Sequence, residues 1–425
     1  MVDNIFNVSL SLSHSGKALN FNSQTSYQSN YRYYKSPIDA DFSPLDGISI
    51  INDYGKNWNQ VKVFTQELRF SSPAETKSGF NWTTGIYLFY QHNPVKQTTR
   101  FGEDAMMLGA QDKNFSLINT ATSKNEGTAF YGQVNYELTQ KLDVTAGLRY
   151  DYEQKQQAIL GEYQKDPDPN PLFDFRPDTS AKASFNEFTP KLGLAYRPSS
   201  YQTLFITYSK GFRAGGLTPL SIDPSQLPLF AFKPEVSNNI EAGIKNTLFN
   251  RRLILNLALF YSNVSDVQVP TLLLPDAVTV TKNAGKLTSK GAELEVRSVI
   301  NGLEVDYSFG YTNATYKKLM ISQNNTEVDL QGNHQLFTPK ITSLLAAQYS
   351  ISLNRKQNLR LLLRCEWKYL GRQYFDLANT IDQSAYHTLN TRFGLTTKKV
   401  SLMFWGRNLK MLNISVMPTT SLRCI

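Results

Sequence analysis

Apolar and polar residues alternate along most of the chain with a period of two. In VTAGLRYDYE (144–153) every even-numbered residue is apolar or aromatic, whereas the odd-numbered residues are threonine, glycine, arginine, aspartate and glutamate. The same period recurs in LEVDYSFGYT (303–312) and in LRLLLRCEWKY (359–369). Because successive side chains of a strand point to opposite faces, each segment is predicted to be a β-strand with one apolar and one polar face.

The length of these segments indicates their environment. They last about 9–12 residues, whereas strands average about 5–6 residues. Ten residues with a rise of about 3.3 Å, tilted by about 45°, climb about 23 Å, which is close to the apolar band of an outer-membrane barrel. Aromatic residues gather toward the ends of the apolar faces, as at Tyr150 with Tyr152 and at Trp367 with Tyr369, which is typical of interfacial girdles.

The pattern predicts an all-β fold, a transmembrane antiparallel β-barrel, with sixteen strands in this chain. The expected strands are 4–12, 18–33, 59–71, 80–92, 127–138, 141–153, 186–197, 201–212, 236–248, 252–264, 287–298, 302–314, 339–352, 358–370, 386–397 and 399–409. We expect no domain boundary, and the Pro- and Asp-rich stretch 165–180 is interpreted as a loop.

The connections between these strands alternate between short and long. The short ones consist of turn-forming residues, such as Thr139-Gln140 and Asn250-Arg251. The long ones are 34–58, 93–126, 154–185, 213–235, 265–286, 315–338 and 371–385. Outer-membrane barrels have this asymmetry, with short periplasmic turns and long outer loops. The long connections are therefore predicted to face the outside of the cell.

Composition excludes several other classes of protein. The 425 residues carry a net charge of +9, and 12% of them are aromatic, which argues against a disordered chain. No basic run reaches five residues, so the charge favours an anionic ligand or lipid headgroups and not nucleic acid. Cys365 and Cys424 are too few for a disulfide scaffold or a zinc site. The N-terminal sequence has no signal-peptide pattern, so we expect either a non-secreted protein or an incomplete precursor.

The sequence predicts no enzyme. The four histidines are scattered, and no G-x-S-x-G, H-E-x-x-H or phosphate-binding loop occurs. We therefore expect no catalytic residue, no metal site and no cofactor. Charges of both signs alternate along the predicted polar faces, and we interpret them mainly as ion pairs that hold the inner wall in shape. These residues are Arg149, Asp151, Glu153, Glu293, Glu295, Arg297, Glu304, Asp306, Arg360, Arg364, Glu366 and Arg392.

Several segments, taken in order, resemble the barrel of TonB-dependent outer-membrane receptors. They are FTQELRFSSP (64–73), FNWTTGIYLFYQ (80–91), FTPKLGLAYRPSSYQTLFITYSKGFRAGGLTP (188–219), the stretch 232–269, NAGKLTSKGAELEV (283–296), GLEVDYSFGYTNATY (302–316), FTPK (337–340) and 389–409. The resemblance is clearest over residues 59–409. It implies a 22-stranded barrel with an N-terminal plug, in the outer membrane of a Gram-negative bacterium.

The chain departs from the family pattern at both ends. It shows no signal peptide, coupling box or plug, and it ends MLNISVMPTTSLRCI where the family has another loop and strand. Sixteen strands would leave both termini outside the cell, whereas six further strands would complete the 22 of the family. We therefore expect residues 1–425 to be a partial barrel domain, a fragment without its plug, that does not work alone as a receptor.

The resemblance implies energy-coupled uptake of a metal chelate such as a ferric siderophore. The implied partners are outer-membrane lipid, the chelate, and the TonB energy-coupling complex in the full-length receptor. Arginine offers a planar fork to carboxylate or catecholate oxygens, and aromatic rings cover flat ligand faces. The candidate ligand-binding residues in the outer loops and upper lumen are Phe212, Arg213, Phe230, Phe232 and Lys233. The alternatives are a passive porin of 16–18 strands and, third, a barrel enzyme.

Overall fold

The fold is known from a computed structural model. It describes residues 1–73, 79–218, 229–273, 278–323, 326–354 and 356–409. Within these ranges the chain is almost entirely β-structure, and its one helical element is the 3-10 turn η1 (Ala105–Leu108). No helix in the described part of the chain is long and apolar enough to cross a membrane.

Sixteen strands follow one another in an antiparallel ladder, and each predicted range overlaps one of them. The strands are β1 (Val2–Ser15), β2 (Asn20–Tyr33), β5 (Gln60–Ser71), β6 (Phe80–Phe101), β7 (Phe115–Thr139), β8 (Leu142–Lys165), β9 (Phe173–Ser199), β10 (Gln202–Arg213), β13 (Glu235–Leu248), β14 (Leu253–Leu273), β15 (Val278–Ile300), β16 (Leu303–Gln323), β18 (Ile341–Asn354), β19 (Leu359–Leu370), β22 (Tyr386–Thr396) and β23 (Ser401–Gly406). All except the six-residue β23 have eleven residues or more. Each strand pairs with the next along the chain.

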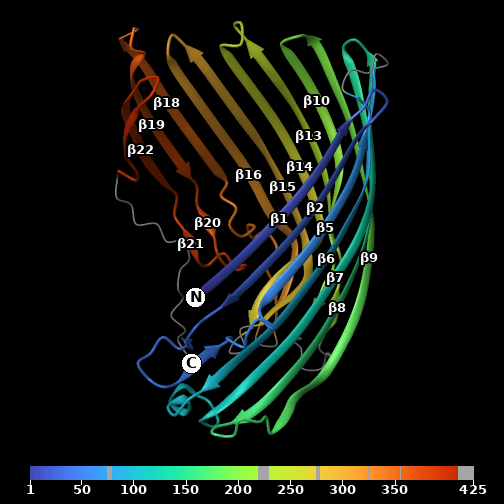
Figure 1. The fold of residues 1–425 in the computed structure, drawn as a ribbon, viewed down its shortest axis with the longest axis vertical. Helices are drawn as coiled ribbons and strands as arrows, with labels where there is room; N and C mark the ends of the chain where they lie inside the picture. The colour runs from blue at the N-terminus through green and yellow to red at the C-terminus, as the bar shows by residue number, and fades with distance from the viewer. Residues whose placement is uncertain (74–78, 219–228, 274–277, 324–325, 355, 410–425) are drawn as a thin grey trace.

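The strands form one curved wall, with the short turns at its upper end and the longer connections at its lower end (Figure 1). At the upper end, Asn301 and Gly302 have φ values of 50° and 86°. Positive φ at both central residues is the signature of a type I′ turn, whose twist matches that of the strands it joins. At the lower end lie the short strands β3 (Ile38–Asp39), β4 (Ile48–Ile51), β11 (Gly216–Thr218), β12 (Phe230–Phe232), β17 (Thr326–Asp329), β20 (Gln373–Tyr374) and β21 (Asp382–Gln383).

Three of the predicted long loops are largely strand, which corrects the sequence-based boundaries. Strands β6 and β7 leave only residues 102–114 between them, and β8 and β9 leave only 166–172. Strands β14 and β15 likewise continue their pairing as far as Leu273 and Val278. Beyond an apolar band both faces of a hairpin can meet water, so the strict alternation fades although the backbone pairing continues.

The two faces of the wall differ as the alternation predicts. Directly opposite residues share a face, and one row of partners crosses β6 to β9 as Ile86, Phe130, Tyr150 and Phe188. Phe130 and Phe188 are 53% and 54% exposed, which is unusual for rings of this size. This apolar face is called the outer face below.

The neighbouring row lies on the opposite, inner face. It runs through Tyr87, Ala129, Asp151 and Glu187. The side chain of Asp151 is only 15% exposed. Side chains on a concave surface converge and shelter one another, which accounts for the low exposure of Asp151.

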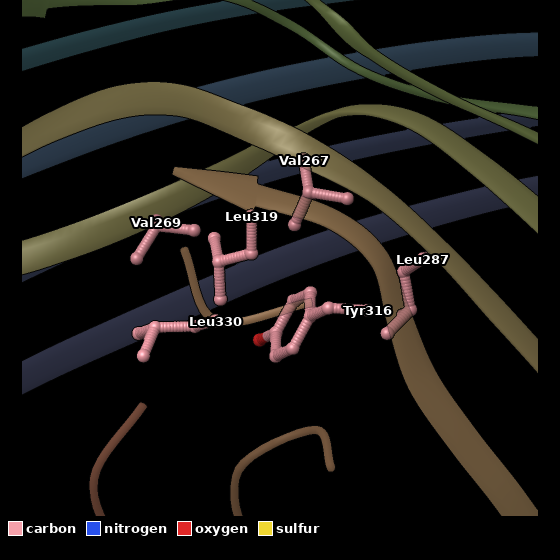
Figure 2. Close-up of a cluster of buried hydrophobic side chains, with 6 residues drawn as sticks. All are labelled: Val267, Val269, Leu287, Tyr316, Leu319 and Leu330. Atoms are coloured by element: carbon pink, nitrogen blue, oxygen red, sulfur yellow. The ribbon is translucent and has the colours of Figure 1, made fainter. Parts of the chain in front are cut away.

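A small apolar cluster braces the extended hairpins at the lower end of the wall. Figure 2 shows its six buried members gathered between neighbouring ribbons; they are Val267, Val269, Leu287, Tyr316, Leu319 and Leu330. They come from β14, β15, β16 and the residue after β17. Burial of such side chains stabilises a hairpin that extends beyond the rest of the sheet.

The described ladder has two edges, β1 and β23. No backbone pairing joins these two strands within the described ranges. Closure of the wall into a barrel, a total of 22 strands and the absence of a plug therefore stay predictions. The all-β antiparallel fold is confirmed.

The two faces of β14 should respond differently to substitution. The period of two along RRLILNLALFY (251–261) places Leu255 and Leu257 on one face. Leu257 pairs with Ile244 and Leu294, and this face is the exposed outer face. Leu257→Arg should lower the free energy of unfolding in a bilayer by about 2–4 kcal/mol if the residue lies near the membrane midplane. The control is Asn256→Ser, because Asn256 hydrogen-bonds Glu295 on the inner face. Equal effects of both substitutions on denaturant unfolding in lipid vesicles would refute the face assignment.

Candidate functional site

Charged and polar side chains pair along the inner face, as predicted for the wall. Arg149 Nη2 lies 2.7 Å from Asp151 Oδ1, and Arg364 Nε lies 2.6 Å from Glu366 Oε1. Arg297 and Asp306 face one another across β15 and β16 at 3.6 Å. These pairs confirm, for six of the predicted wall residues, that the charges hold one another.

The five predicted ligand-binding residues lie in or beside the connection between β10 and β13. Phe212 and Arg213 end β10, Phe230 and Phe232 belong to β12, and Lys233 follows directly. Strand β12 pairs with β11, so residues 216–218 and 230–232 form the base of a small hairpin. The intervening positions 219–228 lie outside the described residues.

The three predicted aromatic residues, Phe212, Phe230 and Phe232, have different surroundings. Phe212 pairs with Val236 and lies on the opposite side of β10 from Arg213, which pairs with Glu235. The ring of Phe232 lies so close to Gly216 that a Cβ there would be 2.4 Å from it. Phe232 therefore packs against the base of the hairpin, whereas Phe230 remains 51% exposed.

Gln268 holds the two ends of this connection together. It is a buried residue of β14, and its Nε2 donates to the carbonyl oxygens of Ala214 at 2.8 Å, Lys233 at 3.2 Å and Arg213 at 3.4 Å. Its backbone N–H donates to Glu235 Oε2 at 2.8 Å. One side-chain amide thus brings the backbones of Arg213 and Lys233 to a common point, although they are twenty positions apart in sequence.

Asn283 of β15 completes this attachment. Its Oδ1 accepts a hydrogen bond from the N–H of Lys233 at 2.6 Å, and its Nδ2 donates to the carbonyl of Lys233 at 2.9 Å. The side-chain amide therefore pairs with Lys233 as a neighbouring strand would. The same Nδ2 donates to the carbonyl of Asp266, a residue with φ of 53° at a bulge of β14. Gln268 and Asn283 were not predicted, because no local pattern distinguishes them from other amides on strands.

These contacts define what the site offers chemically. The side chains of Arg213 and Lys233 are exposed, and Phe230 presents an exposed ring in the same hairpin base. Two cations beside an aromatic ring suit a flat, anionic ligand. In the described part of the chain no group of three or more His, Cys, Asp or Glu side chains has the spacing to hold a metal ion.

A ladder of four aromatic rings links the tips of the β6–β9 hairpins. Phe101 and Phe115 stack with ring centroids 4.4 Å apart, Phe115 and Tyr163 at 5.4 Å, and Tyr163 and Phe173 at 4.8 Å. Cross-strand aromatic pairs of this kind stabilise a sheet. The ladder explains why these hairpins persist so far into the predicted loops.

Ion pairs join three connections beside this ladder. Arg100 lies 3.0 Å from Asp46 and 3.3 Å from Asp166, and Lys113 pairs with Glu103. The hydrogen bond from Arg100 holds the pKa of Asp46 below its ordinary value, and the hydrogen bond from Lys113 does the same for Glu103. Because their pKa values are lowered, these carboxylates are ionised at neutral pH and their ion pairs stabilise the folded connections. This stabilisation is lost as the pH falls through the lowered pKa values.

Comparison with known proteins identifies the family of this chain. The family model described as "TonB dependent receptor-like, beta-barrel" matches residues 2–409. The pesticin receptor of Yersinia pestis is 21% identical over 369 residues, which are 85% of this chain and 48% of that protein. The metal-pseudopaline receptor CntO of Pseudomonas aeruginosa is 25% identical over 251 residues, which are 59% of this chain and 31% of that receptor. The chain thus spans about half the length, or less, of these curated relatives.

Solved structures share the fold. The ferric yersiniabactin uptake receptor FyuA of Yersinia pestis superposes with a TM-score of 0.74 at 19% identity, over 96% of this chain and 56% of that receptor. The siderophore receptor PiuA of Acinetobacter baumannii gives 0.70 at 17% identity, over 96% and 60%. At these identities the likeness is one of fold.

The attachment of Lys233 can be tested by removing one donor group. Asn283→Asp would retain an acceptor for the Lys233 N–H but place a carboxylate oxygen against two carbonyls. We expect residues 230–233 to open more easily, by about 1–3 kcal/mol, and to exchange amide hydrogens faster by mass spectrometry. The control is Asn263→Asp, because Asn263 is exposed on β14 and forms no side-chain hydrogen bond within the described residues. Unchanged exchange at 230–233 in Asn283→Asp would contradict the role assigned to this amide.

Proposed function

This chain belongs to the TonB-dependent receptor-like β-barrel family, and from that membership we propose that the protein takes up a metal chelate, such as a ferric siderophore, across the outer membrane of a Gram-negative bacterium. The family consists of outer-membrane transport receptors and not of enzymes. The proposed energy source is TonB, acting on the full-length receptor.

The observation that carries this proposal is the family match over residues 2–409. The similar proteins suggest the ligand class, because they include receptors for ferric yersiniabactin and metal-pseudopaline and a further siderophore receptor. Chelates of this kind are commonly anionic, which matches the cationic hairpin base at the end of the wall with long connections.

In that hairpin base and directly beside it, we assign contact with the chelate to Phe230, Arg213 and Lys233. Gln268 and Asn283 support this assignment because they hold the backbones of Arg213 and Lys233 in place. Phe232 has a positioning role, since its ring packs on Gly216. Phe212 is assigned a supporting role on the opposite side of β10, where it is the cross-strand partner of Val236.

A passive porin of 16–18 strands is the second candidate function. The sixteen strands of the described ladder are compatible with such a channel. The family and the structural neighbours are receptors, and this favours energy-coupled uptake. The two functions differ in their response to a protonophore, because diffusion through a porin needs no energy source.

The uptake proposal can be tested in cells that lack their own siderophore receptors. The full-length receptor should support accumulation of at least one radioactive iron chelate from a panel of catecholate, phenolate, hydroxamate and citrate complexes, and a protonophore should abolish it. Arg213→Gln with Lys233→Gln should weaken binding of that chelate to chilled cells about tenfold, the loss of roughly 1.4 kcal/mol from charge-assisted contacts.

Matched variants at the opposite end of the wall serve as controls for the loss of two positive charges and for the loss of an aromatic ring. Lys398→Gln with Lys399→Gln removes two exposed lysines from a short turn, and Phe249→Ala removes an exposed ring, as Phe230→Ala does at the site. The controls should bind chelate normally. Accumulation that persists with a protonophore would favour the porin, and normal binding by the site variants would refute the assigned contacts.

The proposed orientation is tested separately by labelling intact cells. With Cys365 and Cys424 first changed to serine, Met107→Cys in the 102–114 connection should react with a membrane-impermeant maleimide. Asn250→Cys, in a short turn at the opposite end, should react only after the cells are opened. The reverse pattern would place the long connections in the periplasm.

A further inference from the structure

A group of lysines lies on the outer face of the wall, immediately beyond its apolar band. On β15 the outward positions run Val296, Leu294 and Ala292 and then change to Lys290, the buried Thr288 and Lys286. Leu294 pairs with the outward Leu257, and this pairing sets the face of the whole series. The outer surface of β15 thus passes from apolar to cationic toward the end of the wall with long connections.

Two tyrosines mark the level at which this change occurs. Tyr261 pairs with Lys290, and Tyr311 pairs with Ala292; both rings are exposed on the outer face. Tyrosine on the outside of a membrane barrel gathers at the boundary between hydrocarbon and headgroups. Lys286, four residues beyond Lys290, lies about 13 Å farther along the strand. Lys286 therefore lies beyond the two tyrosines, on the side away from the apolar band.

A bulge in β16 adds two more lysines to this surface. Lys286 pairs with Lys318, whereas the next position, Leu287, pairs with Tyr316, so Lys317 is an extra residue between them. Tyr316 and Leu319, on either side of the two lysines, are 4% and 0% exposed in the apolar cluster of the inner side (Figure 2). Lys317 and Lys318 are both exposed, so the bulge turns both toward the outer face.

The cluster of Lys286, Lys290, Lys317 and Lys318 has no internal charge balance. Lys286 and Lys318 are direct cross-strand neighbours, an arrangement that destabilises a sheet when both carry the same charge. The ion pairs that lysines form within the described residues involve Lys113, Lys155, Lys165 and Lys210, and none of the four lysines of the cluster. An external anion would relieve this repulsion.

We propose that this lysine cluster binds the phosphate groups of an anionic lipid headgroup, in the leaflet at the end of the wall with long connections. The cluster continues an exposed apolar band, so an occupant that carries acyl chains as well as phosphate satisfies both surfaces. Lysine side chains are long enough to lie along the apolar surface and reach the headgroups. Attraction of this kind between lysines and anionic headgroups is well established for membrane surfaces. This interaction goes beyond uptake of a chelate and does not depend on it.

The test measures lipid binding to the full-length receptor purified in a neutral detergent. The probes are bisphosphorylated lipid A, zwitterionic phosphatidylethanolamine and inorganic phosphate. Lys286→Gln with Lys318→Gln should weaken binding of lipid A about tenfold. Lys286→Arg with Lys318→Arg, which retains the charge, should bind lipid A as the unaltered receptor does. Phosphatidylethanolamine and inorganic phosphate should bind far more weakly to every form.

A matched control on the inner face distinguishes a local site from a general charge effect. Lys191→Gln with Lys368→Gln removes two exposed lysines that face the other side of the wall, and lipid A binding should be unchanged. The proposal is overturned if the glutamine pair at 286 and 318 binds lipid A normally, or if the control pair loses as much. Competition by inorganic phosphate at the same concentration as lipid A would show a phosphate site without lipid and would also overturn it.

Salt dependence provides a second measurement that needs no variant. Exposed lysine–phosphate attractions are screened within about 10 Å at 0.1 M salt and about 3 Å at 1 M. Lipid A binding by the unaltered receptor should therefore fall several-fold between these concentrations. Binding that is unchanged or stronger at 1 M salt would show that acyl-chain contacts alone carry it, and the lysine cluster would have no part.

Discussion

Pairing of backbone N–H and C=O groups between neighbouring strands is the constraint on which the rest of this structure depends. A chain that crosses hydrocarbon has no water to satisfy these groups, so each strand must find them on its neighbours. The pairing also sets the register, and because side chains alternate, the register assigns each of them to a face. The ion pair of Arg149 with Asp151 on the inner face and the row through Phe130 and Phe188 on the outer face both follow from it.

The functional candidates lie where that regular pairing is interrupted. The bulge at Asp266 on β14 lies beside Gln268 and Asn283, whose amides replace a neighbouring strand for Lys233. A second bulge, at Lys317, turns two adjacent lysines to one face of β16. Bulges redirect side chains without breaking a sheet, and so they change the chemistry of a surface at little cost to the fold.

The two faces meet different surroundings, and the ends of the wall differ as well. The outer face is apolar along most strands and becomes cationic beyond Tyr261 and Tyr311. This spatial order suits lipid chains followed by headgroups. At the end with long connections the inner side carries the apolar cluster around Tyr316 and Leu319. That cluster holds the extended β14–β16 hairpins in position, and these hairpins in turn hold the cationic hairpin base that we assign to the chelate.

The sequence by itself determined where strands occur, which face each residue takes and where the short turns lie, because a period of two and the chemistry of turn residues are local properties. The wall ion pairs and the outward position of Leu257 followed from that period.

Only the tertiary structure decided which distant residues meet. Arg213 and Lys233 share one amide of Gln268 because β14 lies beside β13 and carries a bulge there. Phe212, next to Arg213 in sequence, lies on the opposite side of β10 because successive side chains of a strand point to opposite faces. A contact between strands depends on register and on bulges, and these are set by pairing along the whole sheet.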